Sequence, residues 1–309
     1  MSKQAWVFPG QGSQSLGMLS DLVAAYPSIL DTFNQASAAL GYDLWDVVQN
    51  DESKLNQTEV TQPALLAASY ALFRVLKEQG VSLPEYMAGH SLGEYSALVC
   101  AGVIEFADAI KLVEARGQFM QQAVPAGSGA MYAIIGLDDD KVVASCAKAQ
   151  ADCGQIVSAV NFNSPGQVVI AGTTDAAKLA ADFCKEQGAK RALPLAVSVP
   201  SHCALMQPAA EKLQAMLEQM TFSAPQINVI NNVDVAAPVD PAAIKLALVK
   251  QLYSPVRWTE SVQALAEKGV THLAEIGPGK VLSGLIKRID KNLSCEALNS
   301  PETLAAAQA

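Results

Sequence analysis

The sequence predicts an α/β protein in which a large domain is built on a parallel sheet and a smaller unit is inserted into it. Short apolar runs alternate with helical stretches along the first 124 residues, as they do when helices connect parallel strands. One apolar run ends in a Gly-x-Ser-x-Gly pattern at residues 89–93 and leads into a helix. From residue 125 the order of strands and helices changes, which indicates the inserted unit.

Composition limits the class of protein. The 309 residues are 50% hydrophobic and 17% charged, which is enough apolar material for a large core. No apolar run reaches the roughly 18 residues of a membrane-spanning helix, and the first residues lack the pattern of a signal peptide. The 6 cysteines are scattered without a Cys-x-x-Cys pair, so we expect reduced thiols, no metal and a cytoplasmic protein. The net charge of -9 argues against nucleic acid and anionic membranes as partners.

The elements of the first 124 residues follow a strand, loop and helix order. The first strand, at residues 5–8, runs into a glycine-rich loop at 9–14. Helical stretches are expected at 64–79 and 105–122, and between them the strand at 86–88 precedes the Gly-x-Ser-x-Gly turn and a helix at 94–100. This alternation gives the large domain its parallel sheet.

Residues 125–197 have a different order of strands and helices. After a linker at 125–129 we predict a strand at 130–137, a helix at 138–150, strands at 156–162 and 167–172 joined by a hairpin turn, a helix at 174–187 and a strand at 190–197. Thr174 is the expected cap of the second helix. This βαββαβ order predicts a small ferredoxin-like subdomain at 125–197, inserted into a large α/β-hydrolase-like catalytic domain formed by 1–124 and 198–309.

The chain then returns to the large domain. A helix after His202, a strand at 228–231, a helix at 241–252 and a strand at 271–276 are expected there. The last strand leads into residues 277–280, which we interpret as a turn because the spacing of a P-loop is absent. Lys280 could still reach a phosphate-bearing ligand.

Ser91 is the candidate nucleophile. A sharp turn from strand to helix crowds the backbone, so the residues on both sides of the serine must be glycine, as Gly89 and Gly93 are. The turn presents the hydroxyl at a helix N-terminus, where N–H groups can stabilise an oxyanion.

Three histidines could supply the base. His202 follows a proline-containing loop at the junction of the two predicted domains, where clefts form, and is the preferred candidate. His90 adjoins the nucleophile and is expected to be a packed, hydrogen-bonded side chain, whereas His272 lies early in a strand and is expected to be structural. No acid between Ser91 and His202 stands out, so we predict a Ser-His dyad whose second ring nitrogen is held by a neutral acceptor such as a backbone carbonyl.

Arg116 is the most informative charge. On the predicted helix 105–122 it shares a face with apolar residues, at i+4 from Leu112 and i+3 from Val113. A guanidinium there requires an anion. Two alternatives remain open: a structural salt bridge, or a bidentate contact with a substrate carboxylate.

The motifs together resemble those of bacterial malonyl-CoA:acyl carrier protein transacylases and the acyltransferase domains of polyketide synthases. The resemblance covers almost the whole chain. The matching segments are residues 8–14, 61–64, 89–94, 116–117, 161–165, 201–202, 231–233 and 275–279.

The resemblance implies a malonyl transfer that needs no cofactor. In such enzymes Ser91 would accept the malonyl group, His202 would act as base and acid, and Arg116 would bind the malonyl carboxylate. It also implies an oxyanion hole formed by the N–H groups of Gln11 and Leu92, and a backbone carbonyl at Gln251 that orients His202.

The implied partners are malonyl-CoA and acyl carrier protein, with the protein as a monomer. Because the net charge is negative, we expect the acidic carrier to dock on local basic groups, formed by Lys185, Lys190 and Arg191 or by Lys280, Lys287 and Arg288. The main alternative function is a serine thioesterase or esterase that uses the same turn, and a noncatalytic binding protein is a third.

Overall fold

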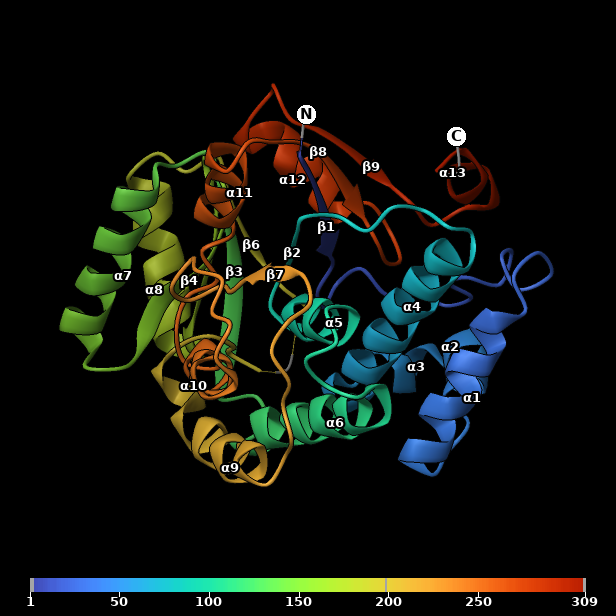
Figure 1. The fold of residues 1–309 in the computed structure, drawn as a ribbon. Coiled ribbons are helices and arrows are strands. Elements are labelled where there is room, and N and C mark those ends of the chain that lie inside the picture. The colour runs from blue at the N-terminus through green and yellow to red at the C-terminus, as the bar shows by residue number, and fades with distance from the viewer. Residues whose placement is uncertain (1–2, 198, 308–309) are drawn as a thin grey trace.

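A computed structural model describes residues 3–197 and 199–307 of the chain. The first two residues and the predicted boundary at 198 lie outside the described residues. Two sheets organise the fold: a five-stranded sheet in the order β7-β2-β1-β8-β9, and a four-stranded sheet in the order β4-β5-β3-β6 (Figure 1). All neighbours pair parallel in the first and antiparallel in the second. The predicted α/β class is confirmed.

The parallel sheet is buried on both faces. Its strands are β1 (Lys3–Phe8), β2 (Tyr86–Gly89), β7 (Asn228–Ile230), β8 (Val270–Glu275) and β9 (Ser294–Ala297). Along β1 the side chains alternate, so that Trp6 and Phe8 enter one hydrophobic core and Ala5 and Val7 enter another. This double burial explains why β1 is apolar without interruption at Ala5–Phe8.

Helices cover the two faces unequally. The core around Trp6 and Phe8 holds α1 (Ser28–Leu40), α2 (Leu44–Asn50), α3 (Glu52–Leu55), α4 (Thr58–Glu78), α5 (Leu92–Cys100), α6 (Phe106–Gln122), α9 (Gln207–Glu218) and α10 (Pro241–Gln251). The opposite core is closed by α11 (Trp258–Glu267) and α12 (Val281–Ile289). A 3₁₀ turn, η1 (Ala204–Met206), precedes α9, and α13 (Pro301–Ala306) follows β9. Within the described residues no helix is long and apolar enough to cross a membrane.

The antiparallel sheet carries its own helices. Its elements follow the order β3 (Gly129–Ile135), α7 (Asp139–Cys153), β4 (Val157–Ser164), β5 (Gln167–Thr173), α8 (Thr174–Glu186) and β6 (Arg191–Pro194). Helices α7 and α8 lie side by side on one face (Figure 1) and enclose a separate core. The other face packs against Cys203, which belongs to the returning chain. The ferredoxin-like subdomain with bounds 125–197 remains our proposal for this part.

Three local predictions are wrong. Helix α4 begins at Thr58 and not at residue 64, because Pro63 is accommodated inside the helix. Thr174 does not cap α8: its hydroxyl donates to the carbonyl of Gly127, and the cap position is Thr173. Strand β6 ends at Pro194, three residues early, and the residues that follow it line a cavity instead.

Candidate active site

The turn between β2 and α5 holds Ser91 in a conformation that L-amino acids rarely adopt, with φ 51° and ψ -107°. Both flanking glycines are required by close backbone contacts. A Cβ atom on Gly89 would lie 1.9 Å from the carbonyl carbon of Gly93, and one on Gly93 would lie 2.0 Å from the carbonyl oxygen of Phe8. The Ser91 N–H donates to the Asn232 side-chain oxygen at 2.8 Å, which ties the turn to the segment after β7.

His202 lies against the serine. Its Nε2 is 2.8 Å from the Ser91 hydroxyl, and its Nδ1 is 2.7 Å from the backbone carbonyl of Gln251. A carbonyl only accepts, so Nδ1 carries the proton and Nε2 is free to accept one from the serine. Burial and the nearby positive charge of Arg116 lower the pKa of His202 to about 3, so the imidazole is neutral near pH 7.

Arg116 points from α6 to the same place and is 1% exposed. Its Nη1 donates to the Gln62 side-chain oxygen at 2.7 Å, and its Nη2 donates to that of Gln251 at 3.0 Å and to the Ser91 hydroxyl at 3.2 Å. The guanidinium also lies over the ring of Tyr95. Among the ion pairs between described residues none involves Arg116. The structural salt bridge considered from the sequence is therefore wrong, because neutral amide oxygens hold this cation.

A buried acid that the sequence analysis passed over lies next to this cluster. Glu94, on the first turn of α5, is 2% exposed. Its Oε2 accepts from the backbone N–H of Asn232 at 2.9 Å and from the Gln251 side-chain nitrogen at 2.8 Å. Burial raises the pKa of Glu94 to about 7, although these donors and Arg116 act in the opposite direction. Its signal in the sequence was a carboxylate directly after the Gly-x-Ser-x-Gly turn, in an otherwise apolar helix.

A cavity of about 670 Å³ opens onto Ser91, His202 and Arg116. Gln11 and Leu92 line it, and within the described chain neither backbone N–H has a hydrogen-bond acceptor. The antiparallel sheet and the segment after it contribute Met131, Asn161 and residues 195–197 to the wall. The cavity therefore lies between the two sheets, at the carboxyl ends of β1 and β2.

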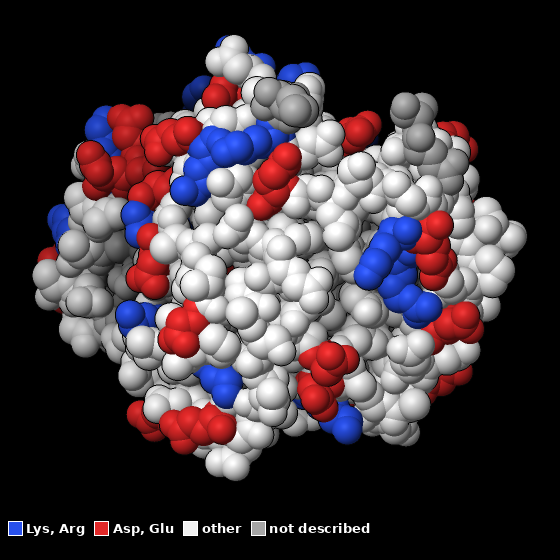
Figure 2. All heavy atoms as spheres, viewed as in Figure 1, with Lys and Arg blue, Asp and Glu red and all other residues white. Residues whose placement is uncertain are grey.

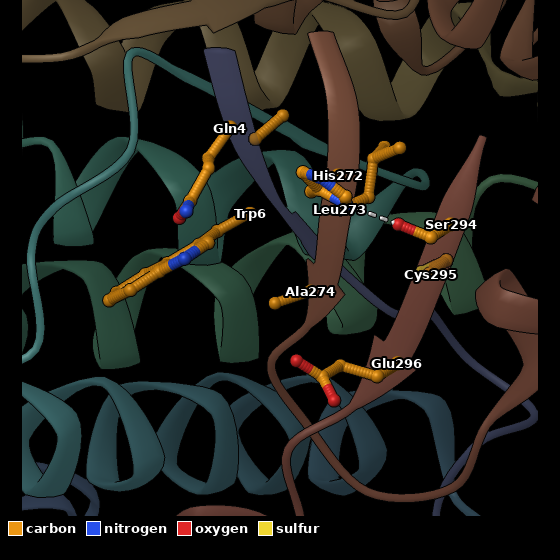
Figure 3. A pocket seen from close by; sticks show the side chains of 9 residues that line it. Gln4, Trp6, His272, Leu273, Ala274, Ser294, Cys295 and Glu296 are labelled. Carbon is orange, nitrogen blue, oxygen red and sulfur yellow. Dashed lines mark hydrogen bonds between the residues drawn. The ribbon is translucent and has the colours of Figure 1, made fainter. Parts of the chain in front are cut away.

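The other two histidines differ from His202. His90 also lines the cavity, but its Nε2 lies 2.7 Å from the side-chain oxygen of Asn163, and burial lowers its pKa. His272 is exposed, and its Nδ1 lies 2.6 Å from the Ser294 hydroxyl in a separate cavity of about 330 Å³ (Figure 3). The residues that line that cavity belong to β1, β8 and β9.

The Gly-Pro-Gly-Lys segment has a structural explanation. Helix α12 follows this segment. The Glu275 carboxylate lies at the N-terminus of α12 and accepts from the N–H groups of Leu282 at 3.0 Å and Ser283 at 2.8 Å. A phosphate would find these donors occupied. Elsewhere in the described chain, no group of three or more His, Cys, Asp or Glu side chains could hold a metal ion.

Comparison with known proteins connects this geometry to a family. Residues 5–300 match the family model described as "Acyl transferase domain". The chain belongs to this acyltransferase family. A malonyl CoA-acyl carrier protein transacylase from Escherichia coli is 61% identical over 308 residues, which cover 99% of both chains. The Haemophilus influenzae protein of the same name is 64% identical over 301 residues, 97% of this chain and 96% of that one.

Solved structures of the family have the same fold. A crystal structure of an acyl carrier protein S-malonyltransferase from Vibrio cholerae is 62% identical, covers 99% of both chains and superposes with a TM-score of 0.96. A malonyl-transacylase in complex with an acyl carrier protein of a type II polyketide synthase is 60% identical, with the same coverage and a TM-score of 0.98. Both likenesses extend over 99% of this chain, so the fold described above is that of the family.

Proposed function

We propose that this protein transfers the malonyl group of malonyl-CoA to the phosphopantetheine thiol of acyl carrier protein, through a malonyl ester on Ser91. The observation that carries the proposal is the convergence on one oxygen: the Ser91 hydroxyl contacts both the His202 imidazole at 2.8 Å and the Arg116 guanidinium at 3.2 Å. A nucleophile next to a buried cation suits an acyl group that ends in a carboxylate. The activity supplies malonyl units for fatty acid synthesis.

The first half-reaction loads the enzyme. His202 Nε2 takes the proton of the Ser91 hydroxyl while the oxygen attacks the thioester carbonyl. The unpaired N–H groups of Gln11 and Leu92 stabilise the oxyanion that forms. When the tetrahedral intermediate collapses, the C–S bond breaks, His202 returns the proton to the sulfur, and coenzyme A leaves with a free thiol.

The second half-reaction repeats these steps in reverse. The carrier thiol gives its proton to His202 and attacks the malonyl-serine ester, and the Ser91 oxygen leaves with the proton that His202 returns. Through both steps the Gln251 carbonyl keeps the imidazole in the reactive tautomer. The Arg116 guanidinium pairs with the malonyl carboxylate and orients the acyl group.

We also propose that the reaction takes place in the cytoplasm. The proposal rests on the character of the thiols, since all six cysteines are free, and four of them are buried.

Labelled malonyl-CoA tests the function. Incubation without carrier should leave one stable malonyl group on Ser91, and added carrier should remove it onto its own thiol. Ser91→Ala should abolish the labelling while its thermal unfolding stays close to that of the parent. Release of free malonate without carrier would identify the protein as a thioesterase. A malonyl adduct on another residue, found by mass spectrometry, would refute the role of Ser91.

A further inference from the structure

The side chain of Gln251 connects the two buried charges of the site. Its oxygen accepts from Arg116 Nη2 at 3.0 Å, and its nitrogen donates to Glu94 Oε2 at 2.8 Å. The same nitrogen lies 3.1 Å from the backbone carbonyl of Ser91. Gln251 is 0% exposed, so solvent cannot replace any of these contacts. One amide therefore bridges a cation on α6 and a carboxyl group on α5.

The chemistry of the two ends allows only one orientation of this amide. A guanidinium only donates hydrogen bonds, and an ionised carboxylate only accepts them. If the amide were flipped, its NH₂ group would face Arg116 and its oxygen would face Glu94, leaving two repulsive contacts in a buried site. Glu94 thus selects the orientation that presents an acceptor to Arg116.

The bridge also explains why the guanidinium of Arg116 can be buried without a direct ion pair. The amide dipole points its oxygen at the cation and its NH₂ group at the anion, so the charges of Arg116 and Glu94 stabilise each other through Gln251. Arg116 Nη1 is fixed independently by Gln62. The side-chain amides of Gln62 and Gln251, one at each Nη atom, fix the plane of the guanidinium. Of these two contacts, only that of Gln251 depends on Glu94.

We propose that Glu94 is a positioning residue: acting through the Gln251 side chain, it holds Arg116 in the orientation that binds the malonyl carboxylate and so favours malonyl over acetyl groups. This inference rests on the proposed function. Glu94 has no hydrogen bond with the side chains of Ser91 or His202, so we expect its main effect at the acyl end of the site.

The ionisation of Glu94 gives the proposal a pH signature. The charged groups that act on it are Arg116 from α6, which lowers its pKa, and Asp234 from the segment after β7, which raises it; burial dominates and sets the pKa at about 7. Above pH 7 the carboxylate is a charged, strong acceptor, and below pH 7 it is a neutral, weaker one. The hold on Arg116 should therefore weaken as the pH falls through 7.

The quantity to measure is the ratio of kcat/KM for malonyl-CoA loading to that for acetyl-CoA loading. Both thioesters use the same nucleophile, base and leaving group, so effects on proton transfer cancel in the ratio. At pH 8 we expect Glu94→Gln, which keeps the shape and removes the charge, to lower the ratio about fivefold. Glu94→Ala, which removes the acceptor, should lower it further.

The pH profile separates positioning from mere support of the fold. In the parent the ratio should fall between pH 8 and pH 6, whereas in Glu94→Gln it should stay flat and low. If the pH dependence of the ratio came from His90 or His202, it would also be present in Glu94→Gln. A flat profile in the variant therefore assigns the pH dependence to Glu94. Glu275→Gln serves as the matched control, because Glu275 is also a buried acid that accepts backbone N–H groups but caps α12; its ratio should equal that of the parent.

Three results would overturn the inference. Equal losses for both thioesters would make Glu94 a structural residue. A ratio that rises in Glu94→Gln would mean that Glu94 repels the malonyl carboxylate. A parent ratio independent of pH, with the Glu94→Gln ratio unchanged, would show no link to Arg116. If instead the parent failed to load malonyl at all, the proposed function and not this inference would be at fault.

Discussion

The two side chains that we propose to react are on residues with positive φ: 51° at Ser91 and 64° at His202. Such conformations are unfavourable for a residue with a Cβ atom and persist only when neighbouring contacts impose them. At Ser91 the Asn232 side chain binds the backbone N–H, and at His202 the N–H donates to the carbonyl of Leu252 at 3.1 Å. The geometry of the dyad therefore depends on partners far away in the sequence.

Replacing Arg116 should change substrate selection more than catalysis. Because its partners are two neutral amides and the serine hydroxyl, its charge remains available for a malonyl carboxylate. Arg116→Ala should lower kcat/KM for malonyl-CoA by about 10²-fold or more, as expected for loss of a bidentate charged contact, and leave acetyl-CoA loading much less affected. Arg116→Lys, which keeps the charge but loses the planar fork, should recover only part of the malonyl activity. Equal losses for both thioesters would contradict the assignment.

The depressed pKa of His202 should appear as acid sensitivity of the fold. The unfolded chain takes up a proton on this residue near pH 6.5, whereas the folded protein does so only near pH 3. The unfolded state therefore binds more protons between these values, and stability falls as the pH is lowered. From pH 7 to pH 4.5 the parent should lose on the order of 3 kcal/mol relative to His202→Asn, which is neutral and tolerates positive φ. Urea unfolding of the parent and of His202→Asn at both pH values gives the difference between their unfolding free energies. If this difference is the same at pH 7 and pH 4.5, the prediction is wrong.

At the scale of elements, the strand–turn–helix from β2 to α5 is the unit that presents Ser91. The close approach of its own ends at Gly89 and Gly93, and of Gly93 to the end of β1, leaves no room for a methyl group. The turn is thus specified by residue size as much as by hydrogen bonding, and it lies against the end of β1, the central strand that pairs with β2.

Gly93→Ala should damage both fold and activity, because the added Cβ would meet the Phe8 carbonyl oxygen at 2.0 Å and the backbone must move. We expect a loss of several kcal/mol of unfolding free energy and of malonyl labelling. The matched control is Gly284→Ala in α12, where a Cβ meets no atom within 4 Å. That variant should gain about 1 kcal/mol through higher helix propensity. Thermal unfolding measures the stability of both variants. A destabilised Gly284→Ala together with a Gly93→Ala as stable as the parent would contradict this prediction.

At the scale of the whole molecule, charge is dispersed. Figure 2 shows acidic and basic side chains interleaved around one face, with an uncharged centre. One residue of each basic group named from the sequence, Lys190 and Arg288, lies near the turn between β4 and β5. The Lys190 side chain packs on Gly136, whose N–H donates to Gly166, and Arg288 donates to the Gln167 side chain at 2.7 Å. Because Asn163 beside this turn contacts His90, the turn lies near the rim of the active-site cavity.

Reversing these charges should weaken use of the acidic carrier without affecting malonyl loading. Charge pairs at a rim chiefly raise association rates and are screened by salt. We expect Lys190→Glu with Arg191→Glu, and separately Lys287→Glu with Arg288→Glu, to lower kcat/KM for carrier and reduce its salt dependence. Lys185 pairs with Asp182 at 3.1 Å and should contribute less. Unchanged carrier kinetics in both variants would exclude this surface, and a loading defect would place these residues at coenzyme A.

The sequence by itself determined the local units. Apolar runs, apolar repeats and turn residues located β1, α6, α10 and the successive elements of the antiparallel sheet to within a few residues, because each of these signals lies within the element or at its ends. It left α1, α11, α12 and β9 unpredicted, although the apolar residues share one face in each of the three helices. It also started α4 after Pro63, a residue that the folded protein accommodates inside the helix.

Only the tertiary structure decided what surrounds Ser91. The sequence could pick out Ser91, His202 and Arg116 as unusual for their positions, but it left open a structural salt bridge to Arg116, which the structure does not have among the described residues, and it overlooked Glu94. The bridge through Gln251 joins α5, α6 and α10, and its partners Glu94 and Gln251 are 157 residues apart along the chain. Such contacts leave no periodic trace, because a buried polar group is satisfied by whatever the fold brings within about 3 Å of it, and that depends on the packing of the whole molecule.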